Sequence, residues 1–207
     1  MRTAYALMGL AWLIIIAAGV YGLNHAFTHS SDNAKTITNS GISTMGPSFS
    51  LNSSAFENDE KIPSQFTCDG AQVSPPLSIS GVPASAKSLV LIMDDPDVPV
   101  ALKPDLPAQA GGVFDHWILF NIPPDTTEIQ QGGSVGTAGN NGAGTAAYTA
   151  PCPPKEYEPS EHHYVFTLYA LDSEIPLTAG ASKKDILAAA EGHIISTVQL
   201  IGRYKRQ

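Results

Sequence analysis

Residues 150–172 read APCPPKEYEPSEHHYVFTLYALD, and the second half of this stretch decides the fold. Residues 164–171 are almost uninterrupted apolar, aromatic and β-branched residues, which is typical of a strand covered on both faces. Residues 88–93 (SLVLIM) and 116–122 (HWILFNI) have the same character. Three such strands indicate the centre of a covered sheet, so the sequence predicts a mainly β domain.

The composition limits the partners of this domain. The chain has 207 residues, of which 43% are apolar, enough to bury one sizeable core. Only 14% of the residues are charged and the net charge is -8, which excludes a basic nucleic-acid-binding face. A small anion is not excluded, because a few local donors can hold one phosphate inside an acidic protein.

The first residues differ from the rest of the chain. Residues 4–23 (AYALMGLAWLIIIAAGVYGL) carry no charge, and about 20 apolar residues are long enough to span a membrane as a helix. An uncleaved anchor fits this length, and a cleaved signal peptide is the alternative, although no Ala-x-Ala site is present. We expect residues 1–24 to be an anchor or signal segment, 25–46 a flexible linker, and 47–207 a domain exported to the periplasm or the cell exterior.

The chain contains two cysteines, Cys68 and Cys152. Two cysteines are too few for a disulfide scaffold, and their spacing does not show whether they lie close together. An exported domain would allow them to pair, and two buried thiols are the equal alternative.

The C-terminal segment has apolar residues at helical spacing. Ser182 is a candidate N-cap, and the spacing continues through Ile186, Leu187, Ala190, His193, Ile194, Val198 and Ile201. This pattern predicts one or two C-terminal helices, with Gly192 as an interruption.

Polar residues with chemical potential cluster at the strand ends. Asp94, Asp95 and Asp97 directly follow the first strand, where they would either face a cavity or form a solvated acidic turn. His116 begins the second strand, and strand alternation predicts that it shares a face with Ile118, Phe120 and Ile122, opposite Asp115, Trp117 and Leu119. A satisfied core histidine is the simpler interpretation of His116.

The third cluster belongs to the opening stretch. His162 and His163 must point to opposite faces of a strand, whereas His162 and Tyr164 share one face and offer donors side by side. The Pro153-Pro154 corner would form a rigid wall beside them. Together these residues favour a pocket for an oxyanion.

Several motifs in order resemble one family. DDPDVP (residues 94–99), DHWILFNIP (115–123), APCPP (150–154), HHYVFTLYALD (162–172), FTCDGAQVSPPLSI (66–79) and EGHIISTVQLIGRY (191–204) are similar to the phosphatidylethanolamine-binding, or Raf kinase inhibitor-like, proteins, in particular their bacterial branch. The resemblance covers about residues 47–205. It implies a large central antiparallel sheet packed with a smaller sheet and C-terminal helices. It also implies a pocket for phosphate-like anions or phospholipid head groups, formed by Asp95, Asp97, His116, Pro153, Pro154, His162 and Tyr164.

One segment departs from the pattern of that family. Residues 155–161 (KEYEPSE) replace a shorter, glycine-containing turn and bring Glu156, Glu158 and Glu161 near the expected pocket mouth. Their negative charge should oppose the entry of an anion, most strongly at low salt.

The resulting hypothesis is an exported binding module without cofactor or metal, whose site is not catalytic and whose ligand is a phosphate-like anion or a phospholipid head group. A protein partner, either a kinase or a protease, is a further expectation from the resemblance. The alternative is an inhibitor of an envelope or extracellular protease or hydrolase, which would act through the surface around the pocket. A metal-assisted hydrolase using Asp95, His116 and His162 is a third reading, although the chain has no Gly-x-Ser-x-Gly or His-Glu-x-x-His motif.

Overall fold

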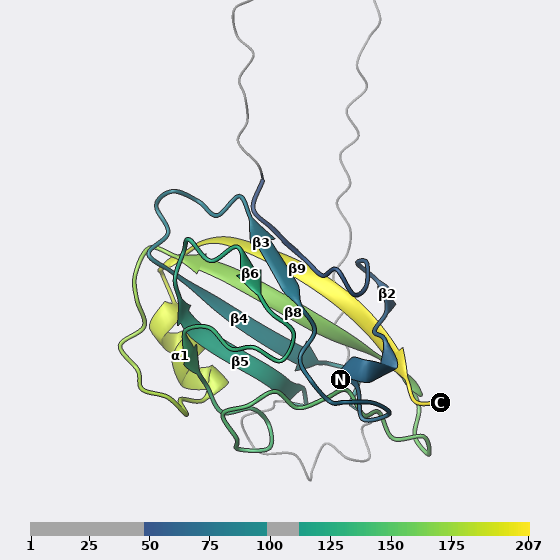
Figure 1. Ribbon diagram of the computed structural model, residues 1–207. Helices are drawn as coiled ribbons and strands as arrows, with labels where there is room; N and C mark the ends of the chain where they lie inside the picture. Colours follow the sequence, from purple (N-terminus) through teal and green to yellow (C-terminus); the bar gives the residue numbers. More distant parts are fainter. Residues whose placement is uncertain (1–47, 99–111) are drawn as a thin grey trace, which may run out of the picture. The chain divides into compact units, whose positions relative to one another are not determined.

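The computed structural model describes residues 48–98 and 112–207, which form two β-sheets and a short α-helix (Figure 1). The expected anchor or signal segment (1–24) and the linker (25–46) lie outside the described residues. Within the described part of the chain, no helix has the length and apolar character needed to cross a membrane.

The larger sheet has six strands in the order β2-β9-β8-β4-β5-β7. Their bounds are β2 (Glu60–Lys61), β9 (Ile194–Lys205), β8 (Glu161–Leu171), β4 (Ser88–Asp95), β5 (Phe114–Ile122) and β7 (Thr137–Ala138). Neighbours are antiparallel, except that β2 is parallel to β9. The three strands predicted from the sequence are β4, β5 and β8, which lie side by side, so that prediction is confirmed.

The smaller sheet has three antiparallel strands in the order β1-β3-β6. These are β1 (Ser50–Asn52), β3 (Leu77–Ser80) and β6 (Glu128–Ile129), and a single 3-10 turn, η1 (Ser64–Phe66), lies between β2 and β3 in the chain. Figure 1 shows β3 and β6 lying across the larger sheet. The predicted fold class, a large antiparallel sheet packed with a smaller one, is therefore confirmed.

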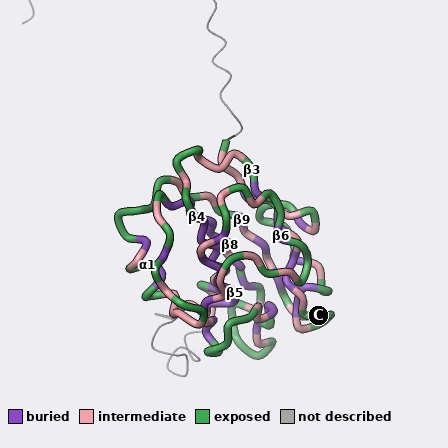
Figure 2. The backbone as a smooth tube through the Cα atoms, turned by 60° about the vertical axis from the view of Figure 1, so that its left-hand side comes forward, coloured by how far each residue is buried: buried purple, intermediate pink, exposed green. Residues whose placement is uncertain are grey.

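Strand alternation divides the core into two layers. Leu89, Leu91 and Met93 of β4 pack with the apolar side chains of the smaller sheet. Val90 and Ile92 point to the opposite face, where they pack with apolar residues of α1 (Lys183–Ala190). Because both faces are covered, β4 is buried along nearly its whole length, as Figure 2 shows for the centre of the molecule.

The C-terminal segment is helical only in part. The hydroxyl of Ser182 accepts a hydrogen bond from the amide of Asp185, which confirms the predicted N-cap of α1. The helix ends at Ala190, and Gly192 adopts a φ of +79°, a left-handed conformation that allows the chain to turn back. The helical prediction for residues 194–201 is wrong, because this β-branched segment forms β9 and pairs with β8 along most of its length.

Candidate functional site

A pocket of about 200 Å³ lies where three strands of the larger sheet meet. Because β4 is antiparallel to β5 and β8, the end of β4 lies beside the beginnings of both partners, and Asp95 pairs with Phe114. These strand ends and the loop before β8 line the pocket with Asp95, Val98, Phe114, His116, Thr149, Ala150, Cys152, Pro153, Pro154 and His162.

The lining includes most of the residues predicted from the sequence, namely Asp95, His116, Pro153, Pro154 and His162. Asp97 and Tyr164 are not part of it. The pocket is also lined by residues that were not predicted, among them Val98, Phe114 and Thr149, whose carbonyl oxygen orients His116. Only their nearness in sequence to the predicted residues could have indicated them.

Asp95 and His162 form the buried centre of the site. The Nδ1 of His162 donates a hydrogen bond to Oδ2 of Asp95 at 2.7 Å, and both side chains are almost fully buried. The other carboxylate oxygen of Asp95 accepts the amide N–H of Asp97 at 2.9 Å. Nε2 of His162 is shielded from solvent and has no hydrogen-bond partner among the described residues. The site therefore contains one unused imidazole nitrogen.

His116 faces the same carboxylate from β5. Its Nδ1 lies 2.8 Å from the carbonyl oxygen of Thr149, and because a carbonyl only accepts, Nδ1 carries the proton. Its Nε2 then lies 3.9 Å from Oδ2 of Asp95. The rings of Phe114 and Tyr164 contact it edge to face, with centroids at 4.8 and 5.1 Å. Two histidines thus converge on one carboxylate.

The face expected for His116 is wrong, because β5 contains a β-bulge. Met93 pairs with Trp117 and Asp94 pairs with Asp115, which leaves His116 as the extra residue between them. As a result, His116 and Trp117 both face the core between the two sheets, where His116 contacts Tyr164. Asp115 and Ile118 face the side that α1 covers. The bulge turns His116 toward Asp95.

Burial and hydrogen bonding act in opposite directions on the Asp95–His162 pair. Burial raises the pKa of Asp95, but the interactions with His116 and His162 outweigh it and hold this pKa below its ordinary value of 3.8. Burial lowers the pKa of His162, but the hydrogen bond and charge of Asp95 raise it to a net value above 6.5. The pair therefore favours a carboxylate beside an imidazolium.

Tyr164 lies beneath the histidines and not at the pocket surface. Its side chain is fully buried, and its hydroxyl has no hydrogen-bond partner among the described residues. Its ring stacks against that of His162, with centroids 6.4 Å apart. Burial raises its pKa far above the ordinary value, so the phenol stays neutral. In this conformation Tyr164 packs and positions the two imidazoles.

Asp97 binds His163, the neighbour of His162 in β8. Its Oδ2 accepts hydrogen bonds from the backbone amide and Nδ1 of His163, both at 2.7 Å. His163 is exposed, whereas His162 is buried, which confirms that neighbouring histidines point to opposite faces of β8. Asp97 therefore ties the loop after β4 to the outer surface of β8.

Asp94 lies on the far side of the sheet from the pocket. Lys183, in the first turn of α1, donates to Asp94 at 2.8 Å and to Asp115 at 2.6 Å. Burial raises the pKa of Asp94 to about 6, although Lys183 acts in the opposite direction. Burial lowers the pKa of Lys183, but the two carboxylates outweigh it and raise this pKa above 10.5. One cation thus holds two neighbouring carboxylates.

Replacing Lys183 with methionine should destabilise the fold, because two partly buried carboxylates would lose their shared cation. We expect the free energy of unfolding to fall by about 2 kcal/mol near neutral pH, less than for a fully buried pair. The pKa of Asp94, followed by carboxyl NMR, should rise above about 6. Lys184→Met, at the exposed neighbouring position, is the control, and an unchanged Asp94 pKa would contradict the assignment.

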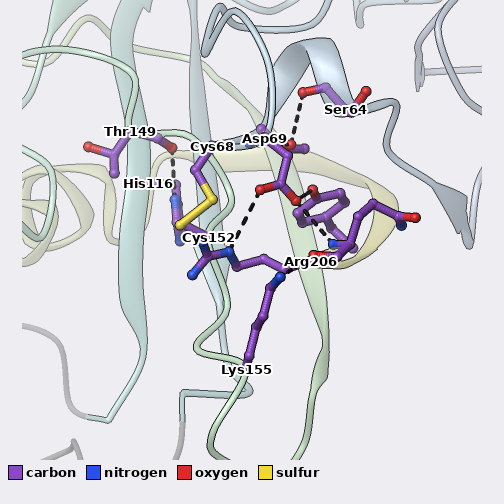
Figure 3. Close-up of a disulfide and its surroundings, with 11 residues drawn as sticks. Ser64, Cys68, Asp69, His116, Thr149, Cys152, Lys155 and Arg206 are labelled. Atoms are coloured by element: carbon purple, nitrogen blue, oxygen red, sulfur yellow. Dashed lines mark hydrogen bonds and ion pairs between the residues drawn. A yellow bond between two sulfur atoms is a disulfide. The ribbon is translucent and has the colours of Figure 1, made fainter.

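A disulfide holds the loop that forms the wall of the pocket (Figure 3). Cys68 and Cys152 are bonded, with their Cα atoms 5.3 Å apart, which decides between the two alternatives left open by the sequence. The amide of Cys68 also donates to the carbonyl of Pro151 at 3.0 Å, and the hydroxyl of Tyr148 donates to the carbonyl of Phe66 at 2.8 Å. The wall is thereby fixed to the segment that follows η1.

The pocket is not a recognisable metal centre in this conformation. Across residues 48–98 and 112–207, no three or more His, Cys, Asp or Glu side chains are grouped so that they could hold a metal ion. What the arrangement offers is a buried histidine paired with a carboxylate, and a second imidazole, within a mostly apolar lining, which suits the binding of a small polar group.

The chain thus folds as two packed β-sheets with a histidine–carboxylate pocket at the strand ends. The sequence profile described as "Phosphatidylethanolamine-binding protein" matches residues 52–205. The chain therefore belongs to the phosphatidylethanolamine-binding protein family.

Relatives of this chain occur in archaea and bacteria. A UPF0098 protein of Methanothermobacter thermautotrophicus is 46% identical over 165 residues, covering 75% of this chain and 98% of the relative. A UPF0098 protein of Chlamydia trachomatis is 41% identical over 157 residues, covering 75% of this chain and 98% of its own length. This distribution fits the bacterial and archaeal branch of the family.

Two solved structures have the same fold. The phosphatidylethanolamine-binding protein homologue CT736 from Chlamydia trachomatis gives a TM-score of 0.70 at 40% identity, covering 77% of this chain and 99% of that one. YbcL of E. coli, described as a member of the mammalian PEBP family, gives a TM-score of 0.66 at 26% identity, covering 78% of this chain and 100% of that one.

Proposed function

We propose that this protein is a binding module whose pocket holds a phosphate-like anion, either free or as part of a phospholipid head group. The observation that carries the proposal is the unused Nε2 of His162. Because Asp95 holds His162 toward its imidazolium form, Nε2–H becomes a buried donor without a hydrogen-bond acceptor of good geometry among the described residues, and an oxyanion would supply one.

The remaining lining supports a small ligand. Nε2 of His116 becomes a second donor when that ring is protonated, and Asp95 can accept from a head-group ammonium. The pocket volume of about 200 Å³ is below the range of about 300–1,000 Å³ typical of drug-sized ligands. It therefore suits a head group and not the acyl chains of a lipid. The proposed role is binding, and it requires no covalent step.

Calorimetric titration of the full chain in an uncharged detergent, with inorganic phosphate and with phosphoethanolamine, tests this proposal. We expect saturable binding that His162→Ala weakens by at least about tenfold. His163→Ala is the matched control, because this neighbouring imidazole is exposed on the opposite face of β8. No binding by a folded wild-type chain, or an equal loss in both variants, would overturn the proposal.

Sulfate provides a pH test, since its charge is constant over the range in which histidine titrates. Binding at the histidine pocket should strengthen as the pH falls from about 8 to about 6, because His162 gains a proton. A flat pH profile would contradict the role assigned to His162.

We also propose that the domain works outside the cytoplasm, held at the membrane by residues 4–23 or released after their cleavage. The apolar run and the Cys68–Cys152 disulfide support this location, because disulfides persist mainly in oxidising compartments.

A further inference from the structure

A second cavity lies next to the histidine pocket along the chain. It has a volume of about 220 Å³ and is lined by Lys155, Glu158, Ser160, Lys205 and Arg206. Lys155 directly follows Pro154, which lines the histidine pocket. One continuous stretch, residues 153–155, therefore contributes to both. The second cavity is built from the unusual loop at residues 155–161 and the end of β9.

Basic side chains are concentrated in this cavity. Three of the 11 lysine and arginine side chains of a chain with net charge -8 line one small cavity. Two carboxylates accompany them: Glu158 in the lining, and Asp69, whose Oδ1 lies 3.8 Å from Nε of Arg206. Within the lining itself, three cations accompany one carboxylate, that of Glu158, and clustered cations attract small anions.

Both carboxylates are already engaged by other donors. Oε2 of Glu158 accepts the backbone amide of Ser160 at 2.9 Å. Oδ2 of Asp69 accepts the hydroxyl of Tyr204 and the backbone amide of Gln207. These contacts hold the two carboxylates to the backbone and to β9, so they compete less strongly with an added anion for the three cations.

Several donors remain for an added anion. Lys205 is exposed, and Nε of Arg206 makes no hydrogen bond to the described residues, its nearest carboxylate being that of Asp69 at 3.8 Å. The ammonium of Lys155 donates to a main-chain oxygen of Gln207, which places it beside Arg206, as Figure 3 shows. Arginine and lysine donors beside a hydroxyl match the acceptors of a tetrahedral oxyanion.

We propose that Lys155, Ser160, Lys205 and Arg206 form a second anion site, which binds a phosphate- or sulfate-type oxyanion independently of the histidine pocket. The loop that carries the added glutamates then contributes to anion binding. It supplies Lys155 and Ser160 to the site, while Glu161 lies 3.7 Å from Arg203. The site goes beyond the proposed function, because it uses neither His116 nor His162.

The test is a sulfate titration of the full chain, in an uncharged detergent, followed by the backbone amide NMR signals of residues 155, 160, 205 and 206. Three variants are compared: Lys205→Gln with Arg206→Gln, His162→Ala, and Lys87→Gln with Lys184→Gln. The last is the matched control, because it removes two exposed cations elsewhere and changes the net charge equally.

We expect saturable shifts at these four residues in the wild type, the control and His162→Ala, with similar affinity near pH 6 and pH 8. Affinity should fall by at least about tenfold in Lys205→Gln with Arg206→Gln. An absence of saturable shifts, an equal loss in the control, or loss in His162→Ala would overturn the second site. Shifts at these residues without binding at the histidine pocket would support it while the proposed function fails.

Inorganic phosphate and phosphoethanolamine then distinguish the source of the oxyanion. Equal affinities at this site would indicate a free anion, and tighter binding of phosphoethanolamine would indicate a head group. Either result supports the proposal. If neither ligand saturates the site, the proposal is overturned.

Discussion

Replacing both Cys68 and Cys152 with serine is expected to lower the free energy of unfolding by about 4 kcal/mol. The disulfide joins residues 84 positions apart, and a cross-link of this span removes much of the conformational freedom of the unfolded chain. The native wall should still form in the variant, because the Cys68–Pro151 and Tyr148–Phe66 hydrogen bonds do not depend on sulfur. The loss of stability should therefore come mainly from the greater conformational freedom of the unfolded chain.

Urea denaturation of three samples measures this effect: the oxidised wild type, the wild type reduced with dithiothreitol, and the double serine variant. Reduction should lower the stability of the wild type to nearly that of the variant, and dithiothreitol should leave the variant unchanged. Equal stability of the oxidised wild type and the variant would show that the bridge does not constrain the unfolded chain.

Asp95→Asn is expected to have the second large effect, lowering the free energy of unfolding by about 3 kcal/mol near pH 6. The substitution keeps the shape of the side chain but removes the charge that stabilises the buried imidazolium of His162. Burial then becomes the dominant influence on His162, so its pKa should fall from above 6.5 to below 6.5. NMR titration of the ring protons of His162 measures this change directly.

The pH dependence of the difference between wild type and Asp95→Asn follows from the two pKa shifts. Folding raises the pKa of His162, so its contribution is complete below 6.5 and is lost as the pH rises through the higher folded-state pKa. Folding lowers the pKa of Asp95, so its contribution is complete above 3.8 and is lost as the pH falls through the lower folded-state pKa. The difference should be greatest between about pH 4 and pH 6.5.

Asp97→Asn is the matched control for this experiment. Asp97 also binds a histidine, but the His163 side chain is 48% exposed, and an exposed pair contributes less than about 1 kcal/mol. A comparable loss of stability in both variants would mean that the buried position of Asp95 has no special role.

The strands at the centre of the fold could be predicted because they are covered on both faces. The apolar runs predict β4 and β8 directly, because a strand covered on both faces shields many β-branched and aromatic side chains from water. The end of the chain was harder to interpret. Apolar residues of β9 happen to fall at helical spacing, and only the ladder with β8, a long-range pairing, determines that they form a strand.

The residue types of the candidate site could be predicted from the sequence, but the directions in which their side chains point could be predicted only in part. His162 and Asp95 lie on regular strands, so alternation places both on the pocket side. His116 lies at a bulge, which strand alternation alone does not predict. Asp97 was expected in the pocket but does not line it, because the packing of β8 against β4 brings it to His163 instead.

The position of β9 also determines when the domain can finish folding. This strand comes last in the sequence, yet it lies inside the larger sheet, between β2 and β8. Its register joins Lys61 to Arg203, so one edge of the sheet is closed by the first and last parts of the domain. During synthesis, β8 must therefore wait with an open edge until β9 leaves the ribosome. For that interval the chain exposes an unpaired strand edge, and the domain acquires its final sheet as a single late event.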